Sequence, residues 1–214
     1  MMKQFWISGV CAAFMAVAPA HLGAQEAGAS NVQRMALSMS LFDYGIAEND
    51  AVSLVTAASI RKAAQLTEGP IGEPDTPLEP GQDPLSWQDM LAEAEARAQG
   101  RADLLGLIED VRAATTKGLI DGAIISKSQV APRGSRSYSR MVFEGGKFAE
   151  IYSEGRGEEN LDMFVYDSRG AVVCSQTDQS PISLCGWTPP ETTAYRVVVQ
   201  NRSDRTAFFS LMTN

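Results

Sequence analysis

Hydrophobic residues recur at two different spacings along this chain. In the first half they stand about one helical turn apart, as Val32, Met35, Ala36 and Met39 do at i, i+3, i+4 and i+7. Past Gly118, apolar and polar residues alternate with a period of two, which is typical of strands that bury one face. The pattern therefore predicts an α+β protein, with a helical region over residues 25–120 and a β region over residues 130–214.

Four short helices are expected in the first region. Asn49-Asp50 offers a cap for the second helix, and Ser86 with Asp89 forms a capping box for the third. The apolar faces of the second, third and fourth helices are Ala51, Leu54, Val55 and Ala58; Trp87, Met90, Leu91 and Ala94; and Leu104, Leu107, Ile108 and Val111. Because no helix can bury such a face alone, we expect a small antiparallel bundle or a pair of helical hairpins.

A proline-rich segment over residues 69–84 separates the second and third helices. It contains Pro70, Pro74, Pro77, Pro80 and Pro84. Because proline cannot continue a helix, we expect an extended loop here. A plain connector is favoured over a partner-binding proline motif.

The second region is expected to hold short antiparallel strands. They are Ser135–Phe143, Phe148–Ser153, Leu161–Tyr166, Ala171–Cys174, Tyr195–Val199 and Ala207–Met212. Turn residues separate them at Gly145-Gly146, at the hairpin signal Asp167-Ser168-Arg169-Gly170, and at Asn201-Arg202-Ser203-Asp204. Short strands at this spacing predict a small β-sandwich.

Residues 1–24 have the pattern of a signal peptide. Lys3 supplies a positive charge, Phe5 to Val17 are mostly apolar, and small residues follow. We expect cleavage after Ala24, with Ala20 as the second choice. The apolar run is shorter than the roughly 20 residues that span a bilayer, and no later segment is apolar enough. The mature protein is therefore expected to be periplasmic or secreted, with no membrane span after signal removal.

Cysteine and histidine usage narrows the possible chemistry. Cys11 lies in the signal peptide, which leaves Cys174 and Cys185 as an even pair in an exported chain and predicts one disulfide. The one histidine, His21, precedes Ala24, so cleavage there leaves no histidine. Serine–histidine and cysteine–histidine catalysis and the commonest zinc sites are then excluded. The net charge of −8 argues against nucleic acid as a partner.

The β region carries a set of motifs in a fixed order: LDMFVYDSRG, CGWTPP, AYRVVVQN and FFSLMTN. The residues that define them are Leu161, Asp162, Tyr166, Asp167, Gly170, Trp187, Pro189, Tyr195, Val197, Val199, Asn201, Phe209 and Leu211. This set resembles the bacterial pre-peptidase C-terminal (PPC-like) domain, although Asn160 stands where the family has an aspartate. The resemblance implies a jelly-roll-like antiparallel β-sandwich that serves secretion, localisation or substrate binding, with no catalytic residues to carry over.

An acidic segment offers a candidate metal site. Glu158, Glu159, Asn160, Asp162 and Asp167 gather oxygen atoms near a predicted turn, and Ca²⁺ prefers several such ligands. A solvated acidic rim is the favoured explanation of the same residues. Calcium is the only cofactor considered, and no other cofactor is expected.

Three further patterns each allow a functional and a structural interpretation. Trp187, beside Cys185, is either a ligand-stacking platform or a core residue. Asn201-Arg202-Ser203 is either a glycosylation sequon or a turn held by the Asn201 side chain. Ser59 and Lys62 match the S-x-x-K motif of serine acyl-transferases, but the companion S-D-N and K-T-G motifs are missing. The structural interpretation is favoured for Trp187 and Asn201, and a chance match is favoured for Ser59 and Lys62.

These features favour an exported, non-catalytic binding module. Its partner would be an envelope or extracellular protein or a glycan, with the sandwich as recognition surface and the helices as a docking region. One alternative is a histidine-free hydrolase that uses Glu158, Glu159 or Asp162 on cell-wall or extracellular polysaccharide. A purely structural envelope protein is the other.

Overall fold

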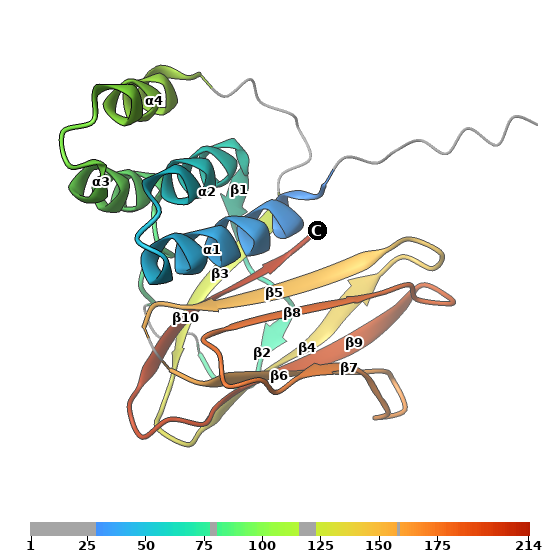
Figure 1. The fold of residues 1–214 in the computed structure, drawn as a ribbon. Coiled ribbons are helices and arrows are strands. Elements are labelled where there is room, and N and C mark those ends of the chain that lie inside the picture. Colours follow the sequence, from blue (N-terminus) through green and yellow to red (C-terminus); the bar gives the residue numbers. More distant parts are fainter. Residues whose placement is uncertain (1–28, 78–80, 116–122, 158) are drawn as a thin grey trace, which may run out of the picture.

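The computed structural model describes residues 29–77, 81–115, 123–157 and 159–214. The predicted signal peptide lies outside them. Figure 1 shows three layers: a group of helices, a β-sheet that the helices cover, and a second β-sheet on the far side. This arrangement confirms the predicted α+β class, with a helical region followed by a β-sandwich.

The helical layer contains α1 (Asn31–Ala47), α2 (Ala51–Ala63), α3 (Trp87–Ala98) and α4 (Ala102–Ala113). Ser30 caps α1 in a capping box with Gln33, and the Asp50 carboxylate accepts hydrogen bonds from the first turn of α2. The predicted box of Ser86 and Asp89 starts α3. None of the helices in the described part of the chain is long and apolar enough to cross a membrane.

Helix α2 lies at the centre of this layer and packs against the other three helices. Its small side chains, Ala57 and Ala58, are fully buried and allow close approach. The apolar cluster that surrounds them is Ala51, Leu54, Val55, Met90, Leu91, Ala94, Ala98, Leu104 and Ile108. These are the faces that the helical spacing predicted, apart from Leu107, which is exposed.

The sandwich consists of two five-stranded sheets. The sheet under the helices, here the covered sheet, has the order β1 (Leu66–Glu68), β3 (Ala123–Val130), β10 (Ala207–Thr213), β5 (Ala149–Gly155) and β8 (Ile182–Trp187). The other sheet, here the open sheet, has the order β2 (Glu73–Pro74), β4 (Ser135–Phe143), β9 (Thr193–Asn201), β6 (Leu161–Tyr166) and β7 (Val172–Gln176). Neighbouring strands are antiparallel except β1 and β3, which run parallel.

The chain before residue 130 contributes more to the sandwich than the sequence suggested. Strand β3 begins at Ala123, ahead of the expected start of the β region, and pairs with β10 from Ile124 to Val130. Strand β1 lies directly before the proline-rich segment, and strand β2 lies inside it. Ile71, between the two strands, is buried in the sandwich core. Pro74 is tolerated because β2 is an edge strand. The supposed connector thus closes one side of the sandwich.

Strand β5 is buried on both faces because it lies between the sandwich core and the helices. Ala149 and Ile151 point into the sandwich, and the alternate residues Glu150, Tyr152 and Glu154 face the helical layer. Tyr152 packs with Val32, Met35, Ala123, Ile125 and Met212 between α1 and the covered sheet. Two of the three helix-facing side chains on this strand are therefore buried carboxylates.

Each of these carboxylates is held by a helix. Arg61 of α2 donates to both Glu154 oxygens at 2.8 and 2.9 Å, and their side chains are only 4% and 1% exposed. Arg61 also donates to the Ser38 hydroxyl and the Leu85 carbonyl, at 2.9 and 2.7 Å. The Tyr152 hydroxyl donates to Glu154 at 3.0 Å. The pair therefore sits in a satisfied hydrogen-bond network, as a buried pair must.

The second carboxylate, Glu150, lies at the N-terminus of α1. It accepts hydrogen bonds from the Ser30 hydroxyl and the Gln33 side-chain amide, both at 2.5 Å. The partial positive charge at a helix N-terminus favours a carboxylate there. Glu150 therefore fixes the first turn of α1 to the covered sheet.

Replacing Arg61 by methionine should destabilise the mature protein by about 3–5 kcal/mol, because Glu154 would stay buried without its cation. The free energy of unfolding in urea, followed by circular dichroism, measures this loss. The double variant Arg61→Met/Glu154→Leu should recover much of the loss, because it removes both charges. Arg101→Met is the control, since Arg101 and Asp103 form an exposed pair. A loss in Arg61→Met no larger than in this control would contradict the assigned role.

Replacing Asp43 by asparagine should stabilise the protein at pH 7. Loss of hydration and the nearby Glu154 charge raise the pKa of Asp43 above its usual 3.8, and Arg61 offsets this in part. The folded state therefore loses stability as pH rises through the raised pKa, and Asp43→Asn removes that loss. Urea unfolding from pH 7 down to pH 4 should show the stability gain shrinking as pH falls. A gain that does not change with pH would refute this explanation.

Candidate functional site

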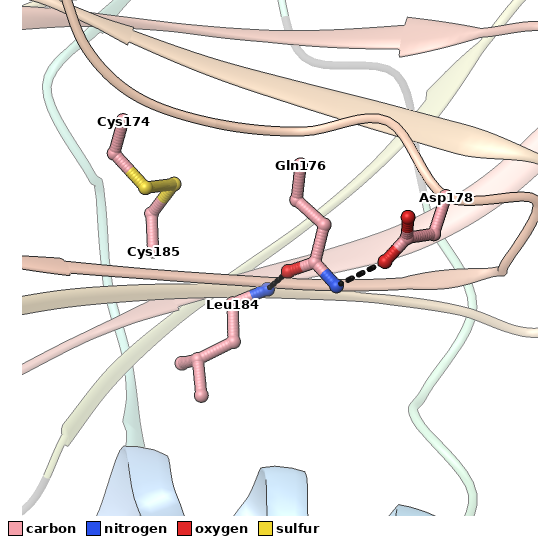
Figure 2. The surroundings of a disulfide bond; sticks show 5 residues. All are labelled: Cys174, Gln176, Asp178, Leu184 and Cys185. Carbon is pink, nitrogen blue, oxygen red and sulfur yellow. Dashed lines mark hydrogen bonds between the residues drawn. A yellow bond between two sulfur atoms is a disulfide. The ribbon is translucent and has the colours of Figure 1, made fainter.

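The predicted disulfide is confirmed. Cys174 of β7 and Cys185 of β8 are bonded, with 5.9 Å between their Cα atoms (Figure 2). The two strands are edge strands of different sheets, so the bond closes the side of the sandwich opposite Ile71. In the chain-entropy model a loop of this size contributes about 3 kcal/mol of stability.

A side chain beside the disulfide seals the same edge. The Gln176 oxygen accepts the backbone N–H of Leu184 at 2.8 Å, and its amide donates to Asp178 at 3.4 Å (Figure 2). Leu184 lies on the edge strand β8, whose outward N–H groups would otherwise be free to pair with another strand. This side of the sandwich is therefore closed to strand addition at that point.

Trp187 belongs to an aromatic cluster in the sandwich. Its ring centre lies 4.9 Å from that of Phe143 and 5.2 Å from that of Tyr195, and the ring packs against the core. Its indole nitrogen is buried and has no hydrogen-bond partner among the described residues. The core interpretation of Trp187 therefore fits better than a ligand-stacking platform.

The acidic residues proposed for calcium do not form one site. Asp167 accepts the backbone N–H groups of Arg169 and Ala171 at 2.9 and 2.8 Å and so holds the β6–β7 hairpin. The Ala171 bond is the main cause of its lowered pKa. Asp162 is the second residue of β6 and Asp167 follows its end, about 16 Å away along an extended strand. Asp167 therefore cannot share an ion with Asp162.

The remaining candidates are Glu159, Asn160 and Asp162, since Glu158 lies outside the described residues. Asp162 is 3% exposed, and one of its oxygens accepts the Arg202 Nε–H at 2.6 Å. Its other oxygen, the Asn160 side-chain oxygen and one Glu159 oxygen are buried without a hydrogen-bond partner in the described part. Among the described residues no three His, Cys, Asp or Glu side chains are grouped to hold a metal. Calcium at this loop stays a prediction.

Asn201 holds a turn, as the structural interpretation of the sequon predicted. Its buried amide donates to the carbonyls of Val130, Ala131 and Arg205, and its oxygen accepts the Ser203 N–H at 2.9 Å. A nitrogen engaged in this way is not presented for glycosylation in the folded protein.

Lys62 has a structural role in place of the acyl-transferase role. It donates to the carbonyls of Val111 and Arg112 at 2.7 and 3.0 Å and lies 4.3 Å from the centre of the Trp87 ring. The ammonium thereby anchors the C-terminal end of α4. Ser59 is exposed on α2.

The outer face of the open sheet carries a surface that the sequence analysis did not single out. The helices cover the other sheet and leave this face free (Figure 1). Phe164 and Tyr166 on β6 lie beside Val198 and Arg196 on β9, in register. We call these four residues the open-face cluster. The outward alternation of Phe164 and Tyr166 was visible in the sequence, but nothing there showed which sheet the helices cover.

The open-face cluster is flat and partly ordered by its own contacts. The rings of Phe164 and Tyr166 are 6.4 Å apart and inclined by only 27°. The Arg196 guanidinium lies 4.1 Å over the Tyr166 ring, a cation–π contact. Arg196 is exposed and has no carboxylate partner in the described part of the chain. Both rings are partly exposed.

The surface hollows in the described part give little support to a carboxylate hydrolase. A polar hollow of about 260 Å³ at the start of α2 contains Asp50, and an apolar groove of about 390 Å³ between α2 and α4 contains Asp110. A third, at one end of the sandwich, contains Glu144. Glycoside hydrolysis needs two facing carboxyl groups. Each of these hollows supplies one.

No protein-family model matches the sequence, and no curated protein matches it. Several solved structures are distantly similar to part of this chain. The pre-peptidase C-terminal domain of a Bacillus anthracis collagenase is 8% identical over 42% of this chain and 87% of its own, with a TM-score of 0.35. PliG, a periplasmic lysozyme inhibitor from Aeromonas hydrophila, is 13% identical over 47% and 91%, with a TM-score of 0.35. The C-terminal CBM6 of LamC from Zobellia galactanivorans is 9% identical over 42% and 88%, with a TM-score of 0.27. These similarities are distant and do not establish a family.

Calcium at 10 mM should raise the free energy of unfolding of the mature protein by about 1–3 kcal/mol if Glu159, Asn160 and Asp162 bind it with the affinity typical of extracellular modules. Glu159→Gln should reduce this gain, because it removes one charged ligand. Asp178→Asn, on the same sandwich, is the matched control and should keep the full gain. Equal unfolding curves with calcium and with EDTA would rule the site out.

Proposed function

We propose that this protein is an exported, non-catalytic binding module whose recognition surface is the outer face of the open sheet. The observation that carries the proposal is the asymmetry of the sandwich. One sheet is covered by helices, and the other presents two aromatic rings and an arginine without a carboxylate partner among the described residues.

The helix-facing side of β5 and the two sides of the sandwich are occupied by structural contacts. Glu150, Tyr152 and Glu154 of the covered sheet are all engaged by helices or by one another. Ile71 closes one side of the sandwich, and the disulfide closes the other. A binding face is therefore best sought on the open sheet.

The composition of that face also favours binding. An antiparallel sheet with one solvated face normally alternates apolar residues inward and polar residues outward. Phe164, Tyr166 and Val198 break this rule side by side on the open sheet. Aromatic residues and arginine are enriched where proteins bind partners, and grouped apolar residues on a free face often mark such sites.

Export and the absence of catalysis rest on different observations. The disulfide is typical of proteins in oxidising compartments outside the cytoplasm. The described residues contain no histidine, and Asp162 of the rival hydrolase is tied to Arg202. A purely structural envelope protein would need the helical layer and the disulfide, but it would have no use for the open-face cluster.

The proposal predicts that binding to native envelope material depends on Phe164. Immobilised mature protein should retain envelope components, and Phe164→Ser should weaken retention about tenfold, the factor that corresponds to losing roughly 1.4 kcal/mol of contact. Leu37→Ser is the control, because Leu37 is an equally apolar side chain, 49% exposed, on α1. Circular dichroism must show that both variants fold. Equal retention by wild type and Phe164→Ser, or no retention at all, would exclude the open face as the recognition surface.

A further inference from the structure

The charge of the open-face cluster indicates what kind of ligand it would bind. Most other arginines of the sandwich face carboxylates; for example, Arg140 pairs with Glu73 at 3.0 Å, and Arg202 with Asp162 at 2.6 Å. Arg196 has no such partner in the described part, although the chain has 26 acidic and 18 basic residues. An exposed guanidinium without a counter-charge on an acidic protein favours an anionic ligand.

The geometry of Arg196 fits a planar anion. The Tyr166 ring lies 4.1 Å beneath the guanidinium and orients it before any ligand arrives. Stacking uses the face of the guanidinium and leaves its N–H groups at the edge, where they can hold both oxygens of a carboxylate. Less ordering of the side chain is then needed on binding.

The neighbours of Arg196 fit a sugar ring. Phe164, next to Tyr166 on the same strand, offers a flat and partly exposed apolar surface against which the C–H face of a pyranose can pack. Ser137 is paired with Val198 and lies on the same face of the sheet, and Gln200 lies two residues from Val198 along β9. A hydroxyl and an amide thus surround the rings and can pair with sugar hydroxyls.

The small size of the apolar surface also argues against a protein partner. A stable protein interface buries about 800 Å² on each side around a desolvated apolar centre. Beside the open-face cluster, Val172 is paired with Tyr166 and is 52% exposed, so the apolar surface consists of Phe164, Tyr166, Val198 and Val172, with Ser137, Ser175 and Gln200 next to it. This size suits one or two sugar units.

Resting on the proposed function, we infer that the open sheet binds an acidic polysaccharide, one that carries carboxylate groups on its sugar rings. Phe164 packs against a sugar ring, and Arg196, oriented by Tyr166, holds the carboxylate. The chemistry that recognises the ligand is therefore a stacked ring together with a bidentate ion pair.

Titration calorimetry of the mature protein should test this with polygalacturonate, alginate and hyaluronate. Fully methyl-esterified polygalacturonate is the matched ligand control, since it keeps the backbone and loses the charge. We expect binding to at least one acidic polymer, at least tenfold weaker binding of the ester, and further weakening at high salt.

Protein variants separate the two contacts. Arg196→Gln should weaken binding of the acidic polymer about tenfold, and Arg196→Lys should recover only part of it because lysine lacks the planar fork. Arg205→Gln removes the same charge from an exposed turn outside the cluster and should bind like wild type. Phe164→Ala should weaken binding of acidic and esterified polymers alike.

Three results would overturn the inference: no binding of any acidic polymer, equal binding of the ester, or unchanged binding by Arg196→Gln. Its failure can be told apart from failure of the proposed function. If envelope retention still depends on Phe164 but is abolished by protease treatment of the envelope, the open face binds a protein, and only the glycan inference is lost.

Discussion

The ion pair between Arg61 and Glu154 joins the helical layer to the sandwich, and the rest of the arrangement depends on it. Both side chains are nearly inaccessible to water, so neither charge is tolerable without the other. Arg61 also binds Ser38 of α1 and the Leu85 carbonyl before α3, which connects three segments of the helical layer at a single guanidinium. Such a pair adds little net stability compared with apolar packing. It does require α2 to sit at one position over β5.

That position determines which face of the sandwich remains available. With α1 fixed by Glu150 and α2 by Glu154, the helices cover the sheet that contains β5. The opposite sheet is then the only one of the two with an uncovered outer face in the described structure (Figure 1). The two buried carboxylates thus help to determine, from the far side of the sandwich, that the sheet with Phe164, Tyr166 and Arg196 is the one left uncovered.

Local signals in the sequence were sufficient where structure is local. The helix caps at Asp50 and Ser86 and the hairpin at Asp167 depend on residues within one turn of chain, and the sequence predicted them correctly. The disulfide was also predicted correctly, because only two cysteines lie outside the expected signal peptide. Strand β3 was missed because its polar run, Ser126 to Gln129, hides the alternation, and its pairing with β10 spans about 80 residues of sequence. The role of Glu154 was missed for a related reason: a charged residue in a strand predicts an exposed face unless its distant partner is known.

The position of β10 has a consequence for how the molecule folds. This strand lies in the middle of the covered sheet, between β3 and β5, although it is formed by residues 207–213. Until those residues are in place, β3 and β5 have no common neighbour and the covered sheet is in two parts. Long-range pairing of this kind slows folding and exposes strand edges in the meantime. A chain that emerges with its N-terminus first, as in synthesis, would thus keep the covered sheet incomplete until residues 207–213 had appeared. The interval before that point is the one in which unpaired strand edges carry the greatest risk of aggregation.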